Sequence, residues 1–197
     1  MKEFFFKTGN YLKYKLLARH RRGFSVHSPF VFELLNSVFF EKEHYYCYEK
    51  IEEIIAENRH KTLFYNKLKY YKLFFRLANY FNAQRVLIVG QNNFIEKIFA
   101  FVSSKVQIFY AKNVKKTDNF DLIFFAENSI ENYKDYELFF KDNLVLIFEN
   151  IYQSKKNSEL WQQIINSNNL IISIDIFHFG IIIVKNEIPK QHYRVAF

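Results

Sequence analysis

The stretch that most constrains the fold is residues 84–96, QRVLIVGQNNFIE. A short β-branched run at 86–89 stops at Gly90 and passes at once into the polar-then-apolar pattern of a helix start. This order is typical of the first strand of a doubly wound α/β domain. Ligands of such sheets bind outside the carboxyl ends of the strands, where the strand order reverses. The turn after Gly90 is therefore the first candidate for a functional site.

The chain before this strand has helical patterns. We predict helices at about 3–19, from Pro29 onwards, at 43–58 and at 62–81. Ser28 suits the N-cap of the second helix, and Pro29 suits its first position, where a missing N–H costs nothing. The many aromatic side chains of these helices could stack on bases, but their helical spacing favours packing in a core.

The first of these predicted helices is amphipathic. Phe5, Leu12 and Leu16 fall on one stripe, and most of the lysines lie off it. We expect this apolar stripe to pack on the protein core, and contact with a membrane surface is the alternative.

After Gly90, strands and helices alternate along the chain. The predicted strands are 86–89, 106–110, 121–126, 144–149, 170–178 and 180–185, and the predicted helices are 93–102, 130–141 and 155–166. The last two strands are joined tightly at Gly180, which predicts an antiparallel hairpin. The fold class is therefore α/β, with a mostly parallel Rossmann-like sheet that ends in a C-terminal antiparallel hairpin and follows an N-terminal helical segment.

The net charge of +8 is concentrated near the amino terminus, because residues 1–22 carry +6 of it. The basic patch that these residues suggest comprises Lys13, Arg19, Arg21 and Arg22. A localised basic segment can bind nucleic acid or an anionic membrane surface. The alternative is a solvated helix face in a lysine-rich protein.

The sequence also indicates a compartment. The single cysteine, Cys47, excludes an internal disulfide and suits a reducing environment. The longest apolar run, 170–184, is interrupted by Asp175 and His178, so no membrane-spanning segment is predicted. The amino terminus lacks the apolar core and the cleavage site of a signal peptide. We expect a cytoplasmic protein, and peripheral membrane binding through the basic segment stays open.

Three stretches resemble one protein family. They are GFSVHSPFVF at 23–32, NLVLIFENIY at 143–152 with Trp161 further on, and PKQHYRVAF at 189–197. They are similar to a bacterial O-methyltransferase-like set, with an HSPF leader, of the class I S-adenosylmethionine (SAM)-dependent methyltransferases. The resemblance implies a Rossmann-like methyltransferase domain at 83–197, with a helical segment at 1–82 packed on it. It also implies SAM as the cofactor and a methyl acceptor that the sequence does not identify.

The resemblance assigns roles to residues by position. It places Gly90, Gln91, Asn92, Tyr110 and Glu127 at the cofactor, Glu149 and Asn150 at the catalytic position, and His27 and Ser28 in the leader or at the substrate. Acidic pairs at the catalytic position of related O-methyltransferases can hold a divalent metal. Asn150 leaves only one charge there, and no cysteine and histidine set has zinc spacing, so we expect no metal site. His27 could instead position the chain just before an N-cap.

The sequence departs from the family at the cofactor contacts. The chain has four glycines, at 9, 23, 90 and 180, so no GxGxxG motif exists. Side chains follow Gly90 directly, where the family is small or glycine-rich. Tyr110 stands at the end of the second strand, where the family has a carboxylate that accepts hydrogen bonds from the ribose, and the acidic residue usual in the first strand is replaced by Ile88. These departures predict that the protein does not bind SAM in the usual way.

A deletion follows the second predicted strand. Nine residues separate Tyr110 from Phe120, where the fold would place a helix, a strand and another helix. Nine extended residues reach roughly 30 Å, and passing one strand requires about 10 Å, so the parallel crossover can form without a covering helix. One edge of the sheet should therefore lack its usual neighbour, and an exposed edge can bind a protein partner or a second copy of the chain.

Three functions remain open at this stage. The first is a divergent methyltransferase that is active on an unidentified acceptor. The second is a pseudo-methyltransferase, a pseudoenzyme that acts as a binding or scaffold protein. The third is binding of nucleic acid or an anionic membrane through residues 1–22, which is compatible with either of the others.

Overall fold

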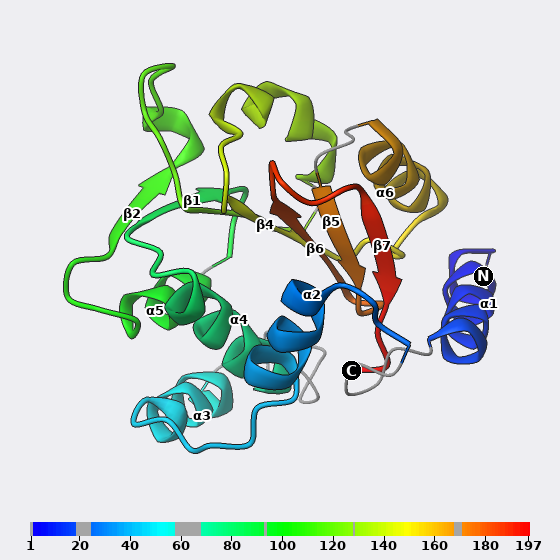
Figure 1. Ribbon diagram of the computed structural model, residues 1–197, viewed down its shortest axis with the longest axis horizontal. Coiled ribbons are helices and arrows are strands. Elements are labelled where there is room, and N and C mark those ends of the chain that lie inside the picture. Colours follow the sequence, from blue (N-terminus) through cyan, green and yellow to red (C-terminus); the bar gives the residue numbers. More distant parts are fainter. Residues whose placement is uncertain (1, 19–24, 58–67, 93, 128, 168–170) are drawn as a thin grey trace.

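The computed structural model describes residues 2–18, 25–57, 68–92, 94–127, 129–167 and 171–197. Seven strands form one sheet in the order β2-β1-β3-β4-β6-β5-β7 (Figure 1). Their bounds are Arg85–Val89 (β1), Gln107–Tyr110 (β2), Leu122–Phe125 (β3), Val145–Glu149 (β4), Ile171–Asp175 (β5), Phe179–Val184 (β6) and Gln191–Arg194 (β7).

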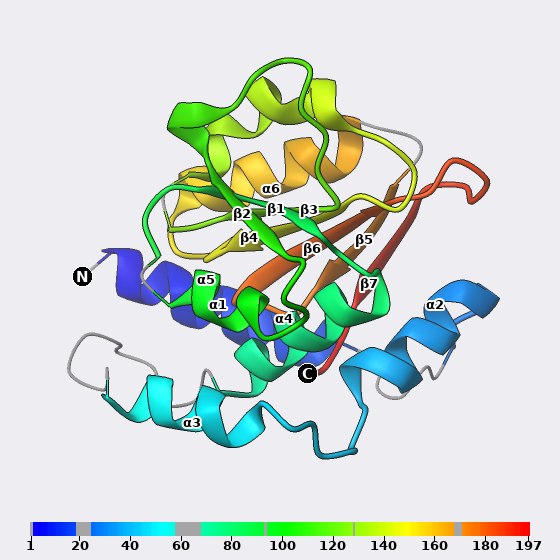
Figure 2. The ribbon, with the colours of Figure 1, turned by 90° about the vertical axis from the view of Figure 1, so that its left-hand side faces the viewer.

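Helices cover both faces of this sheet. The α-helices are α1 (Lys2–Leu17), α2 (Pro29–Leu34), α3 (Tyr48–Glu57), α4 (Leu68–Tyr80), α5 (Ile95–Ala100) and α6 (Lys155–Ser167). A π-helical segment, η2 (Leu35–Phe39), continues α2, and two 3₁₀ segments are η4 (Ala111–Asn113) and η5 (Ile130–Phe139). Figure 2 shows α4 and α5 against one face of the sheet, and η5 and α6 against the other.

The core is divided between the two faces because successive strand residues point to opposite sides. Val86 and Ile88 of β1 belong to one apolar cluster, together with residues of α2 to α5. Leu87 and Val89 belong to a second cluster, together with residues of η5 and α6 and with Tyr14 of α1. The helices before β1 therefore share a core with the sheet.

The sheet has the predicted topology. β1 pairs in parallel with β2 and β3, and β3 pairs in parallel with β4. β6 runs antiparallel between β4 and β5, which confirms the C-terminal hairpin. β7 was not among the predicted strands; it forms within residues 189–197, one of the three stretches that resemble the family, and pairs in parallel with β5. The strand order reverses between β1 and β3, so the carboxyl ends of these two strands mark the switch point.

The hairpin turns at a different residue from the one predicted. The chain reverses over 176–178, where Phe177 adopts a φ of 68°, and Gly180 lies within β6. A Cβ at Gly180 would lie 2.6 Å from the ring of Trp161 on α6. The prediction that Gly180 forms the joint was wrong, because this glycine makes room for an indole and not for a turn.

The helical segment agrees with the sequence at α2 and differs at α1. Ser28 caps α2 as predicted, because its Oγ accepts a hydrogen bond from the N–H of Val31 at 3.4 Å. On α1 two residues of the predicted apolar stripe do not pack, since Leu12 is 58% exposed and Leu16 is 79% exposed. The side chain of the third, Phe5, lies outside the described part of the structure. Tyr14 is buried instead, because its ring packs on Phe177 and its hydroxyl donates to the carbonyl of Val195.

The remaining helices match the predictions with shifted bounds. The predicted helix at 43–58 begins only at Tyr48, and residues 62–67 of the predicted helix at 62–81 lie outside the described residues. The aromatic side chains of α4 are buried, as the spacing indicated; they are Tyr70, Tyr71, Phe74 and Phe75. Nothing in the described ranges has the length and apolar character of a helix that crosses a bilayer.

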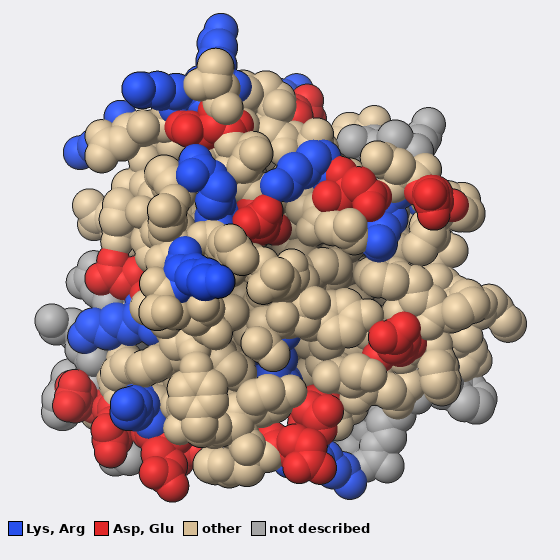
Figure 3. All heavy atoms as spheres, turned by 60° about the vertical axis from the view of Figure 1, so that its left-hand side comes forward, with Lys and Arg blue, Asp and Glu red and all other residues tan. Residues whose placement is uncertain are grey.

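The connection from β2 to β3 is short, as the deletion predicted. It contains only η4 before an irregular segment that leads to β3, and β2 is left at the edge of the sheet with β1 as its neighbour. Exposed lysines lie on this connection, at Lys112, Lys115 and Lys116. Figure 3 shows basic and acidic side chains mixed over the face on which this edge comes forward. Lysines near a free strand edge disfavour pairing with other chains.

Candidate functional site

The candidate site lies where β1, β3 and β4 end side by side. We call this region the switch-point edge and define it by Gly90, Gln91, Asn92, Glu127, Glu149 and Asn150. The parallel pairing of the three strands brings their carboxyl ends to one edge of the sheet. The fold thus gathers six of the predicted site residues in one region.

Gly90 makes the bend at the end of β1. Its φ is +91°, a value that side chains disfavour. A Cβ on this residue would lie 3.2 Å from the Cβ of Ala126 and 3.3 Å from the Cβ of Ser129. The hydroxyl of Ser129 also donates to the carbonyl of Val89 at 3.0 Å, which fixes the bend from the side of β3. Both the backbone conformation and the space therefore require glycine here.

Asn92 orders the turn that leads into α5. Its Oδ1 accepts hydrogen bonds from the N–H groups of Phe94 at 3.2 Å and of Ile95 at 3.1 Å. Its Nδ2 donates to Glu149 Oε2 at 3.4 Å. The Asn92 side chain is thus hydrogen-bonded to the protein itself. Its neighbour Asn93 lies outside the described residues.

Glu149 ends β4 and is buried, with 6% of its surface exposed. Its Oε2 also accepts a hydrogen bond from the backbone N–H of Glu127 at 3.2 Å. Burial, and second the negative charge of Glu149, raise the pKa of Tyr71 on α4. The Glu127 side chain is exposed and accepts from Gln153 Nε2 at 2.5 Å.

Asn150 turns the chain away from β4. Its φ is 58°, and its N–H donates to the carbonyl of His178 at 2.6 Å. Its own carbonyl accepts from Asn157 Nδ2 on α6 at 3.1 Å. The hydrogen bonds that the structure shows for Asn150 therefore use its backbone N–H and carbonyl, and they hold β4, the hairpin and α6 together.

Tyr110, at the end of β2, is 43% exposed and donates its hydroxyl hydrogen to the carboxylate of Glu96 on α5. A carboxylate is therefore present beside the end of β2, although α5 supplies it. Glu96 could not be predicted from the resemblance, which places a carboxylate on the strand itself. Its place in the first turn of α5 is the only local signal.

The leader and basic residues lie elsewhere. Ser28 is buried at the start of α2 and His27 is exposed beside it, so the structure gives Ser28 a capping role. Arg19, Arg21 and Arg22 lie outside the described residues. Lys13 lines a cavity between α1, α6 and the end of β7. Binding of nucleic acid or a membrane through this segment stays a prediction.

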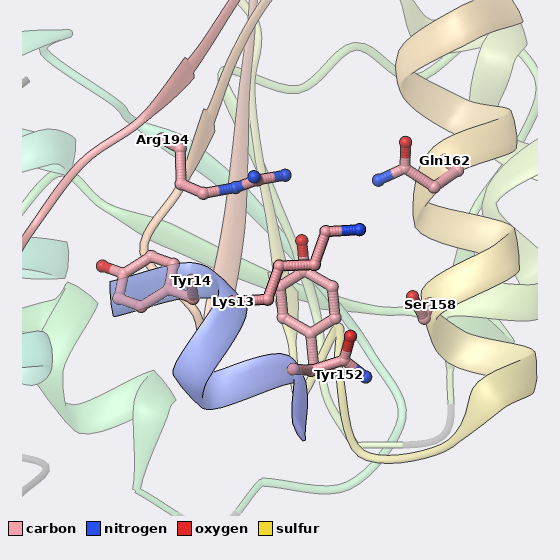
Figure 4. A pocket seen from close by; sticks show the side chains of 7 residues that line it. Lys13, Tyr14, Tyr152, Ser158, Gln162 and Arg194 are labelled. Atoms are coloured by element: carbon pink, nitrogen blue, oxygen red, sulfur yellow. The ribbon is translucent and has the colours of Figure 1, made fainter. Parts of the chain in front are cut away.

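That cavity has a volume of about 250 Å³. We call it the cationic pocket; its lining residues are Asn10, Lys13, Tyr14, Tyr152, Ser158, Gln162 and Arg194. Figure 4 shows the head groups of Lys13, Arg194 and Gln162 directed into the space between α1 and α6. Most of these residues were missed by sequence reasoning, because elements far apart in the chain contribute them.

A buried carboxylate lies behind the cationic pocket. Asp175, at the end of β5, has no exposed surface. Its Oδ2 accepts from the Tyr152 hydroxyl at 2.6 Å and from Arg194 Nε at 3.1 Å, and its Oδ1 accepts from the Phe177 N–H at 2.9 Å. Burial first, and then the charge of Asp175, raise the pKa of Tyr152. The one sequence signal was that Asp175 interrupts an apolar strand.

Metal binding has no support in the described part of the chain. No three histidine, cysteine, aspartate or glutamate side chains there lie close enough together to hold an ion. The absence of a metal site stays a prediction.

Comparison with known proteins identifies the fold. No family model matches the chain, and no curated protein is similar to it in sequence. The chain is similar in structure to the O-methyltransferase TomG from Streptomyces achromogenes, solved in complex with SAM, with a TM-score of 0.53 and 13% identity over 78% of this chain and 95% of that one. For an O-methyltransferase from Bacillus cereus in complex with SAH, the TM-score is 0.47 and the identity is 13%, over 79% of this chain and 97% of that one. For the SAH-bound methyltransferase PaMTH1 from Podospora anserina, the TM-score is 0.48 and the identity is 11%, over 80% of this chain and 97% of that one.

Proposed function

We propose that the chain is a divergent member of the class I SAM-dependent methyltransferase family. The observation that carries this proposal is the bend at Gly90, which has a φ of +91° and lies where the strand order reverses. A residue without Cβ at this point lets backbone N–H groups approach a ligand closely. The fold shared with TomG, solved with SAM, and the resemblance of three stretches to the family support the same conclusion.

The residues at the switch-point edge fit SAM only in part. Gly90 gives the bend a φ of +91° and no side chain, as the close approach of a nucleoside cofactor to the backbone would require. The carboxylate expected at the end of β2 is absent from that strand, and Glu96 of α5 is hydrogen-bonded to Tyr110 beside that position. Asn92 is engaged with Glu149 and with the start of α5. In this proposal, Glu96 would accept hydrogen bonds from the ribose once Tyr110 releases it.

Calorimetry with SAM and with its demethylated product tests the proposal. We expect wild-type protein to bind both at micromolar concentration. The Glu96→Gln variant should bind about tenfold more weakly, because it loses a charged acceptor. Glu53→Gln is the matched control, since Glu53 is an exposed glutamate on α3. The absence of binding by folded wild-type protein would overturn the proposal.

A second candidate function is a pseudo-methyltransferase that acts as a binding or scaffold protein. It is favoured by the hydrogen bonds that the side chains of this region make with one another, from Asn92 to Glu149 and from Tyr110 to Glu96. These contacts satisfy groups that a cofactor would otherwise bind. Folded protein that gives no heat with SAM in the same calorimetry supports this candidate, and micromolar binding contradicts it.

The edge strand β2 offers the pseudo-methyltransferase a place for a protein partner or a second copy of the chain. Sedimentation at increasing protein concentration tests the second copy. An Ile108→Pro variant, which places a proline in the edge strand, should abolish self-association if it occurs through β2. Association that survives this change would contradict pairing at this edge.

A further inference from the structure

The cationic pocket carries a positive charge that is not balanced by a carboxylate of the described residues. Of its seven lining residues, two are cations and none is a carboxylate. Asp175 lies behind the pocket wall and is bonded to Arg194, so one positive charge is balanced. Within the described part of the chain, the ammonium group of Lys13 has no ion pair or hydrogen bond. The pocket therefore has a net positive character.

Arg194 is fixed in the position it would need to bind an anion. Its Nε is held by Asp175 at 3.1 Å, and Asp175 is held in turn by Tyr152 and by a backbone N–H. Figure 4 shows the end of the guanidinium directed into the cavity. An arginine whose orientation is set by a buried carboxylate loses little side-chain entropy on binding a ligand. The side chain is only 22% exposed, which strengthens its interaction with an anion.

The opposite wall adds neutral donors. Ser158 and Gln162 are four residues apart on α6, so they project from the same side of that helix. Figure 4 shows the Gln162 amide and the Ser158 hydroxyl on the α6 side of the cavity, across from Arg194 and Lys13. Donors therefore surround the space from three elements, α1, α6 and β7.

A second cationic cavity in the protein gives a useful contrast. It has a volume of about 340 Å³ and includes Lys69, Lys72 and Arg76. There, Arg76 donates to the carbonyls of Val38 and Phe39 and to Tyr48, Lys72 pairs with Glu52, and Lys69 donates to the carbonyl of Phe197. Lys69, Lys72 and Arg76 therefore hold the fold together, and the fourth cation of that cavity, Lys42, is exposed beside Glu41, which also lines it. Lys13, by contrast, is directed at open space in the cationic pocket.

We propose that the cationic pocket binds the phosphate group of a small ligand. A planar carboxylate is satisfied by a single guanidinium fork, but a phosphate presents oxygens in several directions and suits donors on opposite walls. The volume of about 250 Å³ equals that of roughly eight water molecules, which accommodates a phosphate with a small organic body. This site is separate from the switch-point edge and does not depend on SAM binding.

Calorimetric titration of the full chain with inorganic phosphate and with glycerol phosphate tests the proposal. We expect both to bind, and glycerol alone not to bind. The Lys13→Gln and Gln162→Ala variants should each weaken binding, by about tenfold for the lysine because it donates a charged hydrogen bond. Lys13→Arg should retain most of the affinity. Lys15→Gln is the matched control, because Lys15 is exposed on the same helix and lies over the Tyr11 ring, outside the pocket.

A lipid headgroup is another source of the same phosphate chemistry. Flotation with phosphatidylcholine vesicles, with and without phosphatidic acid, separates the two sources. Vesicle binding that is lost in Lys13→Gln and kept in Lys15→Gln would support the pocket and identify a lipid headgroup. Equal phosphate binding by wild type and Lys13→Gln, or no binding by wild type at millimolar phosphate, would overturn the proposal.

Discussion

Glu149 of the switch-point edge and Asp175 behind the cationic pocket are buried carboxylates at the same end of one sheet, and different groups hold them. Glu149 accepts hydrogen bonds from the amide of Asn92 and the backbone N–H of Glu127. Asp175 accepts from the guanidinium of Arg194, from a phenol and from a backbone N–H. Only the β6 strand separates them, because Glu149 pairs with Phe179 and Asp175 pairs with the next residue, Gly180.

The difference shows how one sheet edge can hold two kinds of site. At the switch-point edge, protein groups bond with one another around a bend in the backbone, so a ligand must compete with internal hydrogen bonds. At the cationic pocket, a buried acid fixes an arginine and leaves other donors directed at a cavity. Ligand binding at the switch-point edge is therefore tested by changes to its internal hydrogen bonds, and binding at the cationic pocket by changes that remove a positive charge.

The largest expected effect comes from the ion pair. We expect Asp175→Asn to lower the free energy of unfolding by about 3 kcal/mol, because it leaves the partly buried Arg194 without its charge partner. Glu149→Gln should cost only about 1 kcal/mol, since the amide can still accept from neutral donors. Urea denaturation of both variants at pH 7 measures the difference. Equal losses would remove the distinction between the two regions.

Gly180, between the two carboxylates, should give the next effect. We expect Gly180→Ala to destabilise the protein by about 2 kcal/mol, because the added Cβ would lie 2.6 Å from the Trp161 ring and push α6 outward. The same change at Gly9, which has nothing within 4 Å, should cause no loss. Thermal unfolding of the two variants measures this. A Gly180→Ala protein as stable as wild type would show that α6, which forms one wall of the cationic pocket, can move away from the sheet without loss of stability.

Asp121, at the opposite end of the sheet, is a third hydrogen-bonded carboxylate whose contribution to stability can be compared with those of Glu149 and Asp175. It accepts from the N–H groups of Gln84 and Arg85 and from the ammonium of Lys141, at 2.8 to 3.0 Å. Burial tends to raise the pKa of Asp121, but these hydrogen bonds outweigh it and lower the pKa below its usual value. We expect Asp121→Asn to cost about 1 to 2 kcal/mol at pH 7.

The pH dependence of that loss follows from the direction of the shift. A carboxylate with a lowered pKa in the folded protein stabilises it fully above the unfolded pKa, about 4. The stabilisation is then lost as the pH falls through the folded pKa. Urea denaturation between pH 7 and pH 2 should therefore show wild type and Asp121→Asn converging in stability at the acid end. A constant gap would contradict the role of this ionisation.

The smallest effect on stability should come from Lys13. We expect Lys13→Gln to change the free energy of unfolding by less than about 0.5 kcal/mol, because its ammonium is an exposed group. The same variant should lose most of its phosphate affinity. A large loss of stability would indicate that Lys13 supports the fold, as Lys69, Lys72 and Arg76 do in the second cavity, and would weaken the contrast between the two regions.

Local patterns predicted much of the fold. The run at 86–89 before Gly90, the Ser28 cap and the alternation after β1 gave the elements, their order and the C-terminal hairpin. Each of these signals depends on neighbours within a few residues, where side-chain spacing and backbone preference act directly. The short connection after Tyr110 followed from chain length alone.

The buried side of α1 could not be predicted in this way. Leu12 and Leu16 have the stronger apolar character, yet both are exposed and Tyr14 is buried. The reason is a partner 181 residues away, the carbonyl of Val195, and a ring contact with Phe177. A helix with two possible faces buries the one that its partners fit.

The sequence by itself determined the α/β order of this protein, the glycine at the switch point and the absence of an acidic residue at the end of the second strand. Tertiary structure alone decided that Glu96 reaches Tyr110, that Gly180 accommodates an indole, and that Asp175 fixes Arg194 beside Lys13. The physical reason is the distance along the chain over which the interacting residues are separated. Backbone conformation is set by neighbouring residues, whereas the position of a charge or a ring in a site depends on groups that only the folded chain brings together.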